Sequence, residues 1–131
     1  MRNFFCYHLP AIIYAAAIIV LSSIPKLHLP EIGFFTTDKF LHFIEYALFA
    51  VLIFRSFSRL LFRFGLKYVV WVSLLFLLVF SLFDELYQGS IPGRDSDAGD
   101  VLLDVLGASL IIFLMWRRAR RSLAADVSNS K

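Results

Sequence analysis

Four long apolar runs, separated by short polar segments, constrain the fold of this chain more than any other feature. They cover about residues 4–24, 40–57, 68–86 and 100–116. A helix needs about 20 apolar residues to cross the hydrocarbon core of a bilayer, and each run approaches that length. The sequence therefore predicts an all-α membrane protein, a bundle of four transmembrane helices. Residues 1–122 would form this single domain, and residues 123–131 a polar, disordered cytoplasmic tail.

The composition leaves little room for a soluble fold. The chain has 131 residues and is 60% hydrophobic and 18% charged, whereas soluble domains average about 45–50% and 25%. The excess apolar side chains must face lipid. A signal peptide is the alternative for the first run, but Ser22-Ser23-Ile24-Pro25 is a poor cleavage site, so we interpret it as an uncleaved span. The single Cys6 excludes an internal disulfide.

The basic residues predict the orientation. Most of the 13 Lys and Arg residues lie at the N-terminus, between the second and third runs, or after the fourth run. Because cytoplasmic loops are rich in Lys and Arg, we expect both termini to be cytoplasmic. Only Lys26, Lys39 and Arg94 fall on the opposite side. These clusters flank apolar runs and do not form one basic stripe, so we expect no nucleic-acid partner.

The segment at residues 83–107 places many polar side chains at the ends of the last two runs. It holds Asp84, Glu85, Gln88, Arg94, Asp95, Asp97, Asp100 and Asp104. Ionisable residues are costly in a membrane and usually have a function there. Pro92-Gly93 is a strong turn signal, and Asp97 or Asp100 is expected to cap the fourth helix.

A second polar group begins the second run. Asp38, His42, Glu45 and Tyr46 share one face of a helix. The topology brings this face and the 83–107 segment to the same, extracytoplasmic, side. The sequence thus predicts one polar binding site, made of Asp38, Lys39, His42, Tyr46, Asp84, Glu85, Gln88, Arg94, Asp100 and Asp104.

Several chemistries are alternatives for this site. Two acids at a helix C-terminus oppose the helix dipole, so Asp84 and Glu85 are either solvated or compensated by Arg94, Lys39 or a cation. A divalent cation would use His42, Asp84, Glu85 and Asp100 as candidate ligands. Acid–base catalysis would use His42, Asp84 and Glu85. Arg94 is either an ion-pair partner of these acids or a clamp for an anion.

Two spaced motifs carry a family resemblance. The first is D-K-x-x-H-x-x-x-Y, from Asp38 to Tyr46, and the second is D-E-x-x-Q-x-x-x-P-G-R, from Asp84 to Arg94, followed by Asp100 and Gly107. Together they resemble the VanZ-like family of small bacterial membrane proteins, over about residues 22–107. Family members often carry Asn at the position of Asp104. The resemblance implies the bacterial cytoplasmic (inner) membrane and an association with resistance to the glycopeptide teicoplanin, but no particular reaction.

Three functions remain alternatives at this point. The first is binding of an anionic lipid or a lipid-linked cell-wall component at the extracytoplasmic face. The second is a membrane-embedded hydrolase or transferase, with or without a divalent cation, acting on a phosphate- or ester-bearing lipid. The third is an ion-coupled transporter, which would need several copies of so short a chain.

Overall fold

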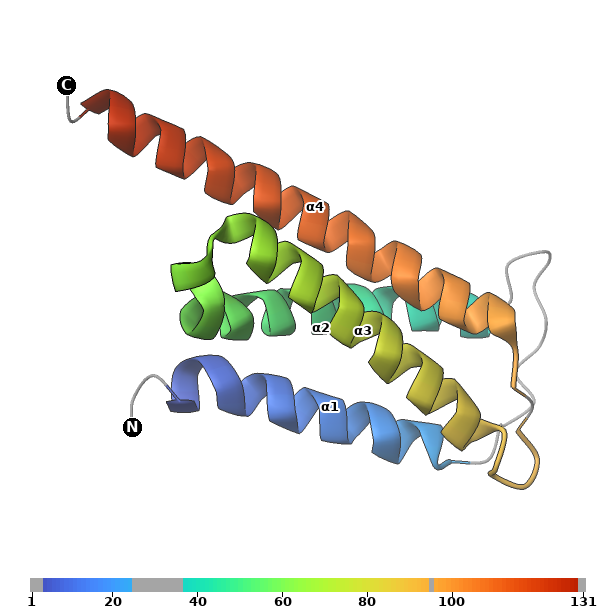
Figure 1. Cartoon of the computed structure of the whole chain (residues 1–131). Coiled ribbons are helices and arrows are strands. Elements are labelled where there is room, and N and C mark those ends of the chain that lie inside the picture. The colour runs from blue at the N-terminus through green and yellow to red at the C-terminus, as the bar shows by residue number, and fades with distance from the viewer. Residues whose placement is uncertain (1–3, 25–36, 95, 130–131) are drawn as a thin grey trace.

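The computed structural model describes residues 4–24, 37–94 and 96–129, excluding the side chains of residues 37, 38, 126, 127 and 129. Over these residues the chain is helical and contains no strand. The α-helices are α1 (Leu9–Ser22), α2 (Thr37–Leu61), α3 (Leu66–Gln88) and α4 (Ala98–Asn129) (Figure 1). A π-helical turn, η1 (Phe4–His8), precedes α1, and a 3₁₀ turn, η2 (Phe62–Phe64), follows α2.

Proline and glycine explain two of the helix boundaries. Pro10 lies in the first turn of α1, where its missing N–H costs no hydrogen bond. Gly65 separates η2 from α3 and has a φ of 97°. That backbone conformation is readily available only to glycine, so the tight reversal between α2 and α3 depends on this residue.

The four helices are long and apolar enough to cross a membrane, which confirms the predicted architecture. The candidate spans are Phe4–Ser22, Lys39–Phe64, Leu66–Gln88 and Ala98–Ala125. The fourth helix is longer than the sequence pattern indicates. We expected a disordered tail from Leu123, and this was wrong, because α4 continues to Asn129. Arg and Ala, which dominate the residues after Trp116, are strong helix formers.

The bundle has two chemically different ends. The start of α1 and the end of α4 lie at one end, and the α3–α4 connection lies at the other (Figure 1). We call the end with the α3–α4 connection the polar end, and the opposite one the basic end, since Arg55, Arg59 and the arginines after Trp116 lie toward it. At the basic end the guanidinium of Arg59 lies over the Tyr7 ring, 4.4 Å from its centroid.

Helix α2 is central and packs against the other three, most extensively against α4. Phe49 of α2 is fully buried, and its ring meets that of Phe80 of α3 edge-on at 5.1 Å between centroids. The backbones of α2 and α4 touch at Gly107, because a Cβ there would collide with the carbonyl oxygen of Phe43. Small residues permit such close helix contacts in membranes. This contact sets His42 opposite Asp104.

The outer surface of the bundle is apolar. Leu86 is 72% exposed and Leu75 61% exposed, and they belong to a long series of exposed large hydrophobic side chains. Soluble proteins rarely present continuous apolar patches of this extent. The surface is therefore suited to contact with lipid.

Candidate functional site

The predicted polar residues gather at the polar end of the bundle. Antiparallel packing brings together the start of α2, the last turns of α3 and the start of α4. The members that are buried, with at most 5% of their surface exposed, are His42, Tyr46, Asp84, Glu85, Gln88, Asp100 and Asp104. Lys39 and Arg94 are partly exposed. The side chain of Asp38 lies outside the described residues.

The first polar cluster joins α2, α3 and α4 around Asp104. The Ser81 hydroxyl donates a hydrogen bond to Asp104 Oδ2 at 2.6 Å, and His42 Nδ1 lies 3.1 Å from Asp104 Oδ1. All three side chains are buried. Asp104 thus uses both of its oxygens to connect neighbouring helices. A buried carboxyl group needs such hydrogen bonds because they offset the loss of its hydration.

This cluster continues outward to the surface. His42 Nε2 lies 3.9 Å from Asp100 Oδ2, and Lys39 Nζ lies 3.8 Å from Asp100 Oδ1. Lys39 also forms an ion pair with Asp97. The side chains of Lys39 and Asp97 are 28% and 49% exposed, whereas that of Asp100 is 4% exposed. We call the set Ser81, Asp104, His42, Asp100, Lys39 and Asp97 the open cluster, because it leads from the bundle interior to the surface.

The second polar cluster joins α1 to α3 around Asp84. The Ser22 hydroxyl donates to Asp84 Oδ1 at 2.6 Å. Gln88 Nε2 lies 3.2 Å from both Asp84 Oδ2 and Ser22 Oγ. We call these three residues the closed cluster, because they bond to one another in a ring and all are buried.

Glu85 and Asp97 hold the connection between α3 and α4. The backbone N–H of Asp97 donates to Glu85 Oε1, and Asp97 Oδ1 accepts from the Gly99 backbone N–H at 2.7 Å. The second bond is an N-cap, which confirms Asp97 as one of the two predicted caps of this helix. Glu85 therefore binds backbone within its own chain, which gives it a structural role.

Arg94 also has a role that the sequence did not indicate. Its Nη1 lies 3.1 to 3.4 Å from the carbonyl oxygens of Leu21, Ser22 and Ile24. These carbonyls lie at or just after the C-terminal end of α1, where a cation is also favoured by the helix dipole. Within the described residues Arg94 forms no ion pair with a carboxylate, so its first task is to hold the end of α1 against the α3–α4 connection.

Two serines of the site were missed in the sequence. Ser22 and Ser81 are ordinary residues of apolar runs, and serine is frequent in membrane helices. The available signal was helical spacing. Ser81, Asp84, Glu85 and Gln88 follow one another at intervals of one to four residues, so they share one face of α3. Tyr46, in contrast, was predicted to belong to the binding site, and it lies one turn deeper than His42, fully buried with its ring edge-on to Phe49.

The metal candidates do not converge on one point. No group of three or more His, Cys, Asp or Glu side chains within the described ranges is arranged to hold a metal ion. Asp84 accepts its hydrogen bonds within the closed cluster and Glu85 accepts from the backbone N–H of Asp97, so neither carboxylate bonds to the same partners as His42. These residues therefore do not fit a divalent-cation site of the kind considered from the sequence.

The fold and the site together define a class of protein, a small four-helix membrane protein with buried acidic side chains at one end of the bundle. Within that class the chain belongs to the VanZ/LLP1 family, whose sequence profile matches residues 6–120. Neither a curated protein nor a solved structure matches the chain. The family assignment therefore rests on that profile.

Proposed function

We propose that the open cluster binds the polar headgroup of a membrane lipid at the extracytoplasmic face of the bacterial inner membrane. The observation that carries this proposal is the path of polar groups from exposed Lys39 and Asp97, through Asp100 and His42, to buried Asp104. Polar contacts that only hold helices together would not need to continue from the bundle interior to the surface. The distribution of basic residues supports the orientation.

The charges of the site narrow the chemistry of the headgroup. Carboxyl groups outnumber cations in the open cluster, where Lys39 is the only lysine or arginine. An anionic group such as a phosphate would therefore bind at Lys39, near the surface. The deeper carboxyl groups would accept hydrogen bonds from hydroxyl or amino groups of the same headgroup. An anionic lipid with a sugar or amine, including a lipid-linked cell-wall component, has both kinds of group.

Native mass spectrometry of the purified protein with phosphatidylglycerol tests the proposal. We expect His42→Gln and Lys39→Met each to weaken binding about tenfold or more. His8→Gln and Lys67→Met are matched controls at the basic end, where His8 contacts Ser56 and Lys67 is exposed. Equal binding by the site variants and their controls would rule out the headgroup site. Teicoplanin sensitivity of cells expressing each variant then tests the link to glycopeptide resistance.

A hydrolase is the second candidate, and one contact favours it. His42 is held between two carboxylates, with Nδ1 toward Asp104 and Nε2 toward Asp100. A histidine held in this way between two acids can exchange a proton on either side of its ring. Incubation with phosphatidic acid should then release phosphate, with a loss of about 10²-fold or more in His42→Gln. Absence of release across a panel of phosphate- and ester-bearing lipids would leave headgroup binding as the sole candidate.

A further inference from the structure

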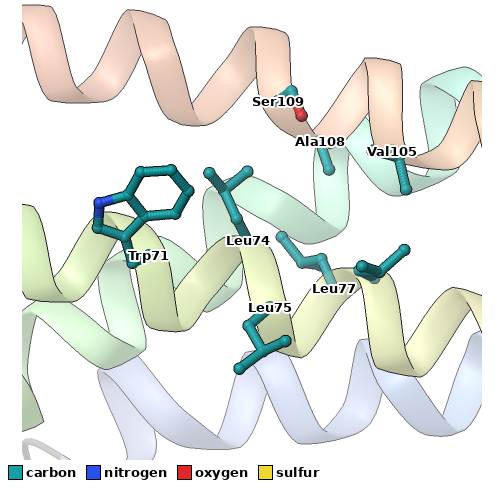
Figure 2. Close-up of a pocket in the computed structure, with 8 residues that line it drawn as sticks. Trp71, Leu74, Leu75, Leu77, Val105, Ala108 and Ser109 are labelled. Atoms are coloured by element: carbon teal, nitrogen blue, oxygen red, sulfur yellow. The ribbon is translucent and has the colours of Figure 1, made fainter.

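An apolar groove of about 230 Å³ lies between α3 and α4, lined by residues of the ranges 71–78 and 105–109. Figure 2 shows Leu74 and Leu77 of α3 directed toward α4, and Ala108 and Ser109 of α4 directed toward α3. Trp71 and Leu75 also line the groove and are 71% and 61% exposed. The groove therefore opens on the outer, lipid-facing surface of the bundle.

The lining of the groove selects a hydrocarbon occupant. Among the lining side chains only the Ser109 hydroxyl and the Trp71 indole N–H are polar, and an apolar cavity with so few hydrogen-bonding partners does not retain water. In a chain that spans a membrane, the medium at this depth is the acyl chains of lipids. An open apolar groove in that medium is filled by hydrocarbon.

The size of the groove distinguishes one lipid tail from a protein helix. From Trp71 to Leu78 the groove follows α3 for about 10 Å. A helix about 10 Å across would need roughly 800 Å³ over that length. One alkyl chain about 4–5 Å across needs roughly 130–200 Å³. A volume of 230 Å³ thus holds a single tail along its length, whereas a helix of a second copy could place only side chains in it.

The groove also begins directly beneath the open cluster. Val105 of the groove follows Asp104, and Leu77 precedes Ser81 by one helical turn. The hydrogen bond from Ser81 to Asp104 closes the groove at that end. Asp100 and Ser109 are separated by about 14 Å along α4, close to the thickness of one hydrocarbon leaflet, about 15 Å. One lipid can therefore reach both places.

We propose that this groove holds one acyl tail of the lipid whose headgroup lies at the open cluster. The assignment of the headgroup rests on the proposed function, whereas the tail site is carried by the groove itself. The lipid would be a glycerolipid of the surrounding bilayer, bound with one tail between α3 and α4 and its other tail in the bulk membrane.

Photocrosslinking in nanodiscs tests the tail site. The discs contain phosphatidylglycerol and phosphatidylethanolamine, with a trace of phosphatidylglycerol that carries a diazirine in one acyl tail. We expect labelled peptides at residues 71–78 and 105–109. Ser109→Phe and Val105→Phe would fill the groove and lower this labelling at least fivefold. Leu110→Phe and Leu106→Phe are matched controls, since these neighbours are 48% and 50% exposed to the outside and do not line the groove.

Three results would overturn the tail site. They are equal labelling in groove variants and controls, labels spread evenly over the outer surface, and displacement of the probe by an equimolar polyprenyl phosphate. The two groove variants act independently, so one of them suffices if the other does not fold.

The same probe in Lys39→Met separates the proposals. If the groove is labelled and the wild type shows no headgroup preference, the tail site is supported and the headgroup site is rejected. If the wild type binds one headgroup selectively and the groove is not labelled, the headgroup site is supported and the tail site is rejected.

Discussion

Asp84 and Asp104 occupy similar positions and have different surroundings. Each is 1% exposed, and each accepts a hydrogen bond of 2.6 Å from a serine on another helix. The difference lies in the second partner. Asp84 accepts from the amide of Gln88, which bonds back to the same serine, whereas Asp104 meets the ring of His42, which faces Asp100 on its other side.

This difference separates a helix tie from a site. The closed cluster satisfies its own hydrogen bonds and gives α1 a polar attachment to α3, in a surrounding where apolar packing alone discriminates little between helix and lipid. The open cluster makes similar ties, but its residues continue to groups that a ligand can reach. Under the proposed function, a buried carboxyl group in this bundle belongs to a ligand site when its partners lead outward.

The largest expected effect comes from moving α4 away from α2 at the open cluster. Gly107→Val would place side-chain atoms against the carbonyl of Phe43, next to His42. The helices must separate, and we expect a loss of about 3 kcal/mol in the free energy of unfolding, as for severe overpacking. Because Gly107 lies on the helix that carries Asp104, headgroup binding should be lost in the folded fraction, whereas the closed cluster between α1 and α3 should remain.

Thermal unfolding in detergent measures the stability of this variant. Leu106→Val, a change to the same residue at a lipid-facing neighbour, is its control. A Gly107→Val protein that unfolds within a degree of that control would show that α2 and α4 do not touch where the structure places them.

Much of this arrangement follows from the sequence. The four apolar runs predicted the helices. The polar side chains were predicted to converge because helical spacing places His42 and Tyr46 on one face of α2 and the topology brings this face and the 83–107 segment to the same end. The division of the acids into two clusters did not follow. It depends on which serine each carboxyl group meets across a helix interface. Helical spacing places Ser81 on the polar face of α3 but does not tell which carboxyl group it meets, and no local signal distinguishes Ser22.

The contacts of Arg94 also could not be predicted from the local sequence. Its position beside acids in the sequence suggested an ion pair, but in the structure its guanidinium binds backbone carbonyls at the end of α1. Likewise, the end of α4 could not be located from hydropathy, because the arginines that end an apolar run do not end a helix. Hydropathy locates the membrane boundary and helix propensity locates the helix end, and these differ in α4.

A pair of isosteric changes sharpens the comparison of the two aspartates. In Asp84→Asn, an NH2 group replaces one of the two oxygens that accept from Ser22 and Gln88, so one buried donor faces another donor. We expect a loss of about 1–3 kcal/mol in the free energy of unfolding. In Asp104→Asn the ring nitrogen of His42 can accept a hydrogen bond from the new amide group, so the loss should be smaller. Thermal unfolding of both variants gives the order, and a larger loss in Asp104→Asn would contradict the ring described for Asp84.

The smallest effect on stability, with a large effect on binding, is expected from Lys39→Met. Ion pairs of partly exposed lysines contribute about 0–1 kcal/mol, so the unfolding transition should move little. Removing the cation should weaken binding of phosphatidylglycerol about tenfold, and added salt should weaken binding to the wild type more than to the variant. Lys67→Met at the basic end is the control for loss of one positive charge. If Lys39→Met unfolds as readily as Asp84→Asn and binds phosphatidylglycerol normally, the open cluster is a helix tie like the closed one.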